Sequence, residues 1–123
     1  MKTPKRILER RRSVRISEPF LFKIGGQGYD IQAISVNLSS CGVMGIVEAD
    51  IPVMTQLDIG LQLPIKTLKG TVKSKLLRIK GAVVRKERDA RTGRFLIAIY
   101  FHKIKASDQK WLEFFIGRYL KTP

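Results

Sequence analysis

A strict alternation of apolar and polar residues near the middle of the chain most constrains the fold. Every second residue from 57 to 63 is Leu or Ile, and the residues between them are Asp, Gly and Gln. Side chains of a β-strand point alternately to its two faces, so this period of two predicts a strand with one buried face. Comparable apolar segments, separated by turn residues, predict six or seven strands: 20–24, 29–38, 43–47, 57–63, 67–72, 76–88 and 94–102.

Two of these strands depart from a simple alternation. In 29–38 the apolar phase slips by one residue at Ala33–Ile34, which predicts a bulge or a barrel corner there. Residues 95–101 are apolar at every position, whereas an antiparallel strand normally needs only one apolar face. We therefore expect another element, the C-terminal segment, to cover the outer face of this last strand.

The C-terminal segment has the pattern of an amphipathic helix over about residues 107–120. Its large apolar residues fall on one helical stripe, and Lys110, Glu113 and Arg118 lie off it. Packing against the sheet is the favoured role of this stripe, which consists of Trp111, Leu112, Phe115, Ile116, Tyr119 and Leu120. Many short strands with one terminal helix predict a mainly β protein, a small antiparallel β-barrel that leaves no open sheet edge.

Length and charge limit the domain organisation and the class of partner. The chain has 123 residues, enough for one domain, and its formal net charge is +14. Residues 1–15 carry seven basic residues against one acidic residue, and we expect 1–12 to be a flexible basic arm in front of a barrel domain at 13–123. Such a charge predicts an anionic partner, and nucleic acid, a nucleotide, an acidic protein and an anionic membrane all satisfy it.

Cysteine content and hydropathy indicate the compartment. Cys41 is the only cysteine, so no disulfide can form within the chain. The sequence has no apolar run of the about 18 residues that a membrane helix requires, and its start lacks the apolar core of a signal peptide. These features lead us to expect a cytoplasmic protein.

An arginine cluster, Arg10-Arg11-Arg12 followed by Arg15, is the first motif that carries chemistry. A guanidinium group can donate two hydrogen bonds to guanine O6 and N7, match phosphate oxygens and stack on a purine. Arg11 and Arg15 would share a face in either a helical turn or an extended segment. By itself, however, such a run is more typical of a solvated arm or of nonspecific contact with nucleic acid.

The second motif is the turn Asn37-x-Ser39-x-x-Gly42. Asn and Ser can bond to the nearby backbone, or offer an amide and a hydroxyl to a base or a phosphate. Gly42 permits either a positive φ or the close approach of another backbone. Taken alone, the motif is more typical of an ordinary turn at the end of a strand.

In order and spacing, the two motifs together resemble those of the PilZ domain family. In this family R-x-x-x-R precedes the first strand and D/N-x-S-x-x-G ends the next. Residues 81–85 look like the family's G-x-V segment, and 95–101 look like its final barrel strand, which a C-terminal helix follows. The resemblance implies a six-stranded β-barrel that binds the bacterial second messenger cyclic di-GMP.

The resemblance also implies roles for individual residues. Arg11 and Arg15 would hold guanine and phosphate, with Arg10 and Arg12 beside them. Asn37 and Ser39 would contact a guanine and its linkage. Gly42 would shape the turn, and Arg85 would stack on a base. A basic residue at the position of Arg10 is associated in the family with a stacked ligand dimer. Two positions depart from the commoner family residues, with Asn at 37 in place of Asp and Cys at 41 in place of Gly.

Nothing in the sequence predicts an enzyme or a metal site. His102 is the only histidine, so together with Cys41 it supplies too few ligands for a His/Cys zinc site. Cys41 is best interpreted as a small turn residue. We therefore expect no catalytic residue, no metal and no cofactor apart from the ligand cyclic di-GMP. Ligand binding would draw the arm onto the barrel and change a surface that an unidentified downstream protein recognises.

Two alternatives remain open from the sequence. A small barrel that binds RNA or DNA would account for the charge, although no surface stripe of aromatic residues supports it. A PilZ-like scaffold could also bind only protein. The family's usual outputs are control of motility, adhesion, exopolysaccharide or virulence, and the sequence does not choose among them.

Overall fold

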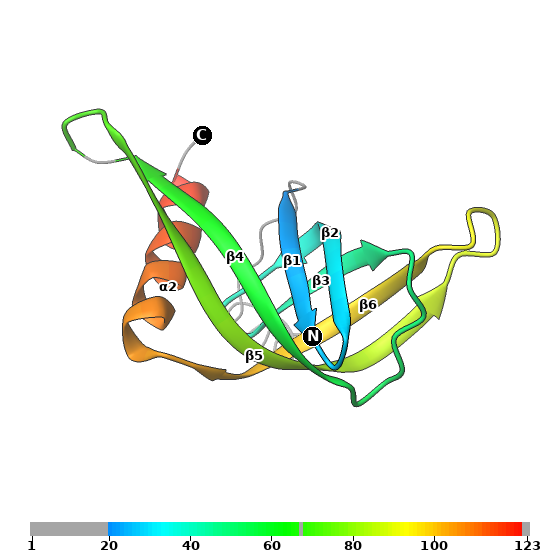
Figure 1. Cartoon of the computed structure of the whole chain (residues 1–123). Helices are drawn as coiled ribbons and strands as arrows, with labels where there is room; N and C mark the ends of the chain where they lie inside the picture. Colours follow the sequence, from blue (N-terminus) through cyan, green and yellow to red (C-terminus); the bar gives the residue numbers. More distant parts are fainter. Residues whose placement is uncertain (1–19, 67, 122–123) are drawn as a thin grey trace, which may run out of the picture.

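Six strands and one helix make up the computed structural model, which describes residues 20–66 and 68–121, with side chains described for 20–64 and 68–117 (Figure 1). The elements are β1 (Leu21–Gly26), β2 (Tyr29–Leu38), β3 (Gly42–Val47), β4 (Gln56–Lys66), β5 (Val72–Arg88), β6 (Phe95–Ile104) and α2 (Ala106–Lys121). The strands form a closed barrel in the order β1-β2-β3-β6-β5-β4, and every neighbouring pair is antiparallel. The predicted six-stranded antiparallel barrel with a C-terminal helix is confirmed.

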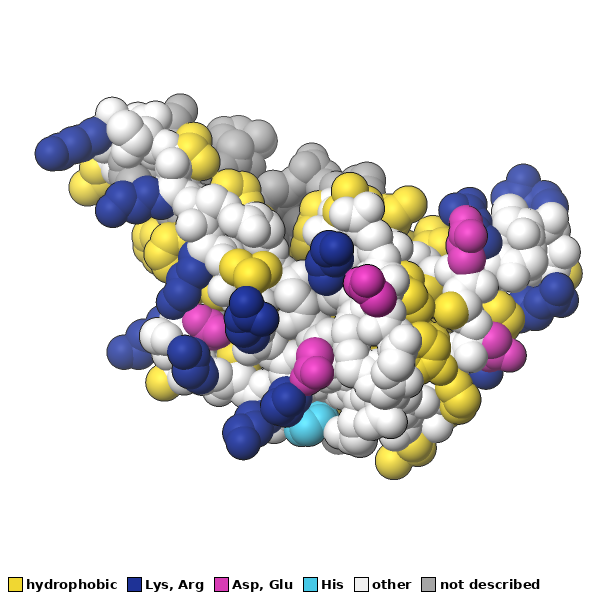
Figure 2. Space-filling view, in the orientation of Figure 1, with side chains coloured by type: hydrophobic (Ala, Val, Ile, Leu, Met, Phe, Trp, Pro, Cys, Tyr) yellow, Lys and Arg dark blue, Asp and Glu magenta, His cyan; other side chains and the backbone are white. Residues whose placement is uncertain are grey.

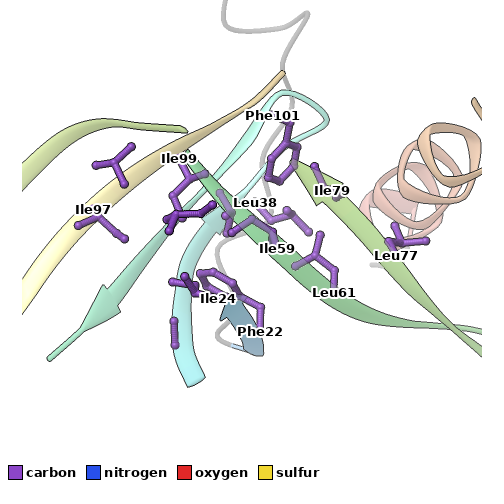
Figure 3. Packing of buried hydrophobic residues seen from close by; sticks show 14 of the residues in the cluster. Phe22, Ile24, Leu38, Ile59, Leu61, Leu77, Ile79, Ile97, Ile99 and Phe101 are labelled. Atoms are coloured by element: carbon purple, nitrogen blue, oxygen red, sulfur yellow. The ribbon is translucent and has the colours of Figure 1, made fainter. Parts of the chain in front are cut away.

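The core forms where the alternating residues of the strands turn inward. The predicted alternation in β4 is confirmed, since Leu57, Ile59, Leu61 and Leu63 are at most 3% exposed. Figure 3 shows Ile59 and Leu61 of this strand among side chains of neighbouring strands in the core. The fully buried large side chains are Phe22, Ile24, Leu38, Ile51, Ile59, Leu61, Leu63, Leu77, Ile79, Ile97, Ile99 and Leu112.

The outer part of the β4–β5 hairpin extends beyond the barrel (Figure 1). β4 and β5 pair along their whole shared length, from Gln56↔Ala82 to Lys66↔Val72. In the described part of the chain, β1 pairs with β4 only at Asp58–Gly60, and β6 pairs with β5 only from Ile79 onward. The hairpin therefore projects as a two-stranded ribbon, and α2 lies along it.

Three polar contacts hold α2 against this ribbon. The carboxylate of Asp108, only 3% exposed, accepts a hydrogen bond from the backbone N–H of Arg78 at 3.3 Å. The same carboxylate lies 3.2 Å from Lys75 Nζ. The indole N–H of Trp111 donates to the Leu63 carbonyl oxygen at 3.2 Å. Leu112 is fully buried and Ile116 is 6% exposed, so these two residues of the helix join the hydrophobic core.

The prediction of a separate strand at 67–72 is wrong. Residues 68–70 form a turn, and residue 67 lies outside the described residues. Val72 opens β5, one continuous strand of 17 residues that also contains the segment predicted at 76–88. Gly70 has a φ of 87°, which glycine adopts without steric cost, so the chain reverses here rather than continuing as a strand.

The predicted phase slip in β2 occurs later than Ala33–Ile34. Pairing between β1 and β2 is regular through Leu21↔Ile34, and the register with β3 shifts between Ser35 and Asn37. Ile34 therefore points outward and is 39% exposed, while Ser35 is buried. The Ser35 hydroxyl accepts a hydrogen bond from the Phe20 N–H at 3.1 Å, which allows a polar side chain to occupy an inward position.

The sequence predicted that the C-terminal helix would cover the outer face of β6, but the described part of α2 does not cover it. Tyr100, on that face, is 53% exposed. The contacts of Asp108 and Trp111 instead direct α2 to the β4–β5 ribbon. The outer apolar face of β6 is thus available to line a surface site.

Candidate functional site

The turn that connects β2 to β3 is built around Ser39. The Ser39 N–H donates to the Gly42 carbonyl oxygen at 2.9 Å, and its hydroxyl donates to the same oxygen at 3.4 Å. The hydroxyl also accepts a hydrogen bond from the Cys41 N–H at 3.1 Å. Ser39 is 7% exposed, so in this structure its hydroxyl is engaged in fixing the turn.

Gly42 is required for close approach of two backbones and not for a positive φ. A Cβ at this position would lie 2.3 Å from the carbonyl oxygen of Ile99 on β6. The Cys41 carbonyl oxygen accepts a hydrogen bond from the Phe101 N–H at 2.8 Å, immediately beside this contact. The turn is therefore held tightly against β6, which brings the Asn37–Gly42 motif next to the outer face of that strand.

A hollow of about 190 Å³ lies on this outer face of the barrel. The turn motif supplies its polar edge, and apolar side chains of β3, β5 and β6 supply the rest. Asn37 is half-buried in the hollow, and its amide has no hydrogen-bond partner among the described residues. The residues that matter for the argument are Asn37, Ser39, Gly42, Val84, Ala98 and Tyr100.

Arg85 lies beside the hollow but does not line it. The register of β5 against β6 shifts between Val83 and Arg85, and Arg85 pairs with Ala98. Residues directly opposite each other on paired strands share a face of the sheet, so exposed Arg85 is on the same outer face as Ala98. A guanidinium at this position can reach a ligand that extends out of the hollow.

The structure therefore brings together part of the predicted site. Asn37, Ser39 and Gly42 line one hollow, and Arg85 is next to it. The four predicted arginines, Arg10, Arg11, Arg12 and Arg15, lie outside the described residues. Their roles stay predictions.

Sequence reasoning missed the part of the site that β5 and β6 contribute. Val84 and Tyr100 line the hollow and are 51% and 53% exposed. The sequence carried no signal for Tyr100, because residues 95–101 are apolar on both faces. In the structure Ile97 and Ile99 are buried, so Ala98 and Tyr100 point outward. We had instead assigned both faces of this strand to packing.

A larger groove, of about 650 Å³, crosses the outer faces of β1, β4 and β5. Gly60 lies between Lys23 and Arg78 in the strand pairing and leaves the space open. The charges that line the groove are mixed, because Lys80 pairs there with Asp58 at 2.8 Å. We do not favour this groove as the main site, since it contains no aromatic side chain and none of the predicted residues.

No group of His, Cys, Asp or Glu that could hold a metal ion is found among the described residues. His102 Nε2 lies 2.6 Å from Gln56 Oε1 at the surface. A search of the helices within the described part of the chain finds none that is long and apolar enough to cross a membrane.

Comparisons with known proteins bear on the fold. No protein-family profile matches the sequence, and no curated protein matches it. The solved structures that are similar include the following two. The inhibitor of motility MotI/DgrA of Bacillus subtilis superposes with a TM-score of 0.72 at 20% identity, over 92% of this chain and 53% of its own. The PilZ domain of YcgR from Escherichia coli, solved with c-di-GMP, superposes with a TM-score of 0.55 at 15% identity, over 91% of this chain and 95% of its own.

The closed barrel with its terminal helix is thus a PilZ-like domain in fold. The chain spans about half the length of the Bacillus protein that it resembles.

Proposed function

We propose that this chain is a non-catalytic receptor for cyclic di-GMP and that the ligand binds at the hollow beside the β2–β3 turn. One observation carries the proposal. The Asn37–Gly42 motif lines a surface hollow on a barrel whose fold is shared with a PilZ domain that was solved with this ligand.

The side chains around the hollow suit a guanine base. The amide of Asn37, which has no hydrogen-bond partner among the described residues, can both donate to and accept from a base edge. The exposed ring of Tyr100 offers a face on which a purine can stack, an interaction worth about 1–3 kcal/mol per base. Val84 and Ala98 contribute apolar contacts, and Arg85 can reach a phosphate or stack on the second base.

The hollow is too small to enclose a dinucleotide. Pockets for ligands of drug size usually have volumes of about 300–1,000 Å³, and this hollow has about 190 Å³. Cyclic di-GMP would therefore rest on the hollow with much of its surface outside. We infer that Arg11 and Arg15 supply the missing contacts, with Arg10 and Arg12 beside them. A stacked ligand dimer would give Arg10 a second base to contact.

The output of such a receptor requires a second protein. Binding would draw the arginine segment onto the barrel and present a changed surface to that partner, and we expect this to take place in the cytoplasm. The similarity in fold to an inhibitor of motility makes motility the first output to examine. Adhesion, exopolysaccharide and virulence control are the next outputs to examine.

Calorimetric titration with cyclic di-GMP at physiological salt, with GTP as a control ligand, tests the proposal. We expect selective binding that Arg11→Ala and Arg15→Ala abolish, and that Asn37→Ala weakens by roughly tenfold, equivalent to about 1.4 kcal/mol. Arg91→Ala, which removes an exposed arginine from the β5–β6 turn, is the matched control and should bind like the wild type.

Two results would reject the proposal. One is the absence of any heat or melting shift with cyclic di-GMP. The other is equal affinity in the Arg11→Ala, Arg15→Ala and Arg91→Ala variants. If RNA binds instead, with an affinity that falls steeply as salt rises, the alternative of a nucleic-acid-binding barrel is favoured.

A further inference from the structure

The β4–β5 hairpin is the most one-sidedly charged part of the barrel. Between Asp58 and Glu87 the sequence contains eight Lys and Arg residues and no Asp or Glu. Figure 2 shows Lys and Arg side chains along the ribbon that projects in Figure 1, including at its tip. Charge of one sign on a protruding element indicates an anionic partner.

Several of these cations are already paired within the protein. Lys75 lies 3.2 Å from Asp108 and its ammonium group is 5.7 Å from the centre of the Trp111 ring. Lys80 pairs with Asp58, and Lys86 pairs with Asp50. Lys69 and Lys73, close to the tip, are exposed and form no ion pair with any described residue. Arg78 and Arg85 are also exposed and form no ion pair with any described residue, but they lie at the barrel, opposite Gly60 and Ala98. Lys69 and Lys73 are therefore the unpaired cations nearest the tip of the hairpin.

The tip also exposes large apolar side chains. Leu68 is 98% exposed, the highest value among the large hydrophobic residues described, and Val72 is 65% exposed. Gly70, with its φ of 87°, makes the turn that places these two residues at the extreme end of the ribbon. Exposed apolar side chains close to unpaired cations match the composition of segments that bind at a membrane interface.

We propose that the tip of the β4–β5 hairpin binds the surface of an anionic lipid bilayer. Leu68 enters the boundary between headgroups and acyl chains, and Lys69 and Lys73 contact the acidic headgroups. Lysine is suited to this position because its apolar stem can lie along the interface while its ammonium group stays hydrated. The site lies on the projecting ribbon, so the proposal does not depend on the nucleotide site.

The apolar tip favours a bilayer over a polynucleotide. Phosphate contacts need the cations and gain nothing from an exposed leucine at the point of contact. A membrane surface uses both, because buried apolar area and attraction to acidic lipids add in binding at the interface. The role of Leu68 therefore separates the two kinds of partner.

Vesicle co-sedimentation of the full chain tests the proposal, with vesicles of phosphatidylglycerol and phosphatidylcholine in equal parts and of phosphatidylcholine alone. We expect binding only to the anionic vesicles. Lys69→Gln/Lys73→Gln should weaken it roughly 30-fold, since each lysine near an acidic surface contributes about a fivefold gain. Leu68→Ser, which changes no charge, should weaken it roughly tenfold.

The matched control is Arg88→Gln/Arg91→Gln, which removes two positive charges at the opposite hairpin between β5 and β6 and should bind nearly as the wild type does. Because all these positions are exposed, the melting temperatures of the variants should match that of the wild type.

Three outcomes would overturn the proposal. The first is a wild-type protein that does not sediment with anionic vesicles. The second is binding that Leu68→Ser leaves unchanged, which would indicate nonspecific attraction of a basic protein. The third is equal loss in the two double variants, which would show that net charge and not the hairpin tip is responsible. RNA binding that requires Lys69 and Lys73 but not Leu68 would point to a polynucleotide as the partner instead.

Discussion

Replacing Gly42 with alanine should destabilise the whole barrel, because the added methyl group has no room. The new Cβ would lie 2.3 Å from the Ile99 carbonyl oxygen and 3.4 Å from the Tyr100 Cα. Both are backbone atoms of β6, so no side chain can rotate away to relieve the clash. β3 and β6 must separate at the point where Gly42 pairs with Tyr100.

The cost has two parts. Forcing an extra methyl group into a packed site costs about 1–3 kcal/mol. Separation of the strands also threatens the hydrogen bond from Phe101 N–H to the Cys41 carbonyl and the one from Ser39 N–H to the Gly42 carbonyl, each worth about 1 kcal/mol. We expect the free energy of unfolding to fall by roughly 2–5 kcal/mol. This is a large share of the total, because a typical domain is stable by about 5–15 kcal/mol.

Urea denaturation followed by circular dichroism measures this loss, and thermal melting should show a fall of roughly 8–20 °C. The matched control is Gly117→Ala in α2, where a Cβ would meet nothing within 4 Å. There the same change should stabilise the protein by about 0.5–1 kcal/mol, since glycine disfavours a helix interior. If Gly42→Ala costs less than about 1 kcal/mol, the backbone contact does not hold the turn in place and this reasoning fails.

Two further predictions concern carboxylates. Asp108→Ala should lower the free energy of unfolding, measured by urea denaturation, by about 2 kcal/mol, because it removes a buried acceptor of the Arg78 N–H and the partner of Lys75. Asp108→Asn keeps an oxygen acceptor and should cost less. Equal costs in the two variants would contradict this account. The pKa of Asp89 is held below its ordinary value of 3.8, first by the hydrogen bond from the Arg91 N–H and then by the Thr92 hydroxyl. Its ionised form therefore favours the folded state above the ordinary pKa, and this contribution is lost as the pH falls through the lowered value. A carboxyl titration by NMR should place the Asp89 midpoint below 3.8 in the wild type and closer to 3.8 in Thr92→Val. A wild-type midpoint at or above 3.8 would exclude a lowered pKa for Asp89.

The period of two predicted the barrel wherever one face of a strand was polar. β4 is the clearest case, because Asp58, Gly60 and Gln62 mark the outer face without ambiguity. The prediction failed where outward residues are themselves apolar. Ile34 in β2 and Tyr100 in β6 are residue types that are common in protein cores. Only the register of the neighbouring strands shows that they point outward.

The turn at 68–70 was missed for a related reason. Thr71 and Val72 favour extended structure, so the segment has the composition of a strand. Gly70 adopts its positive φ because β4 and β5 must reverse there to pair with each other. The pairing of the two strands, Lys66 with Val72 at this end, is not encoded in the composition of the segment that connects them.

The candidate site was only partly predictable. Asn37, Ser39 and Gly42 were predicted from the resemblance of their motif to the PilZ family, and they line one hollow. Ser39 and Gly42 also have structural tasks that the motif cannot distinguish from ligand contacts. Val84 lines the hollow because of the bulge in β5, which depends on the pairing with β6. The strand neighbours of a motif, and not the motif alone, define the surface that a ligand would meet.

The ribbon that projects from the barrel has two backbone edges with no neighbouring strand among the described residues, and α2 bonds to them at the Leu63 carbonyl and the Arg78 N–H. Beyond the pairing with β1 and β6, the outer residues of β4 and β5 have no further strand beside them in the described part of the chain. Open edges invite strands of other copies and so promote aggregation, which lysine and proline on the edge discourage. Pro64 on β4, with Lys73 and Lys75 on β5, meets this need. The same lysines that make the hairpin basic therefore help to keep individual molecules apart, and a chain that lost them would be expected to self-associate through the ribbon.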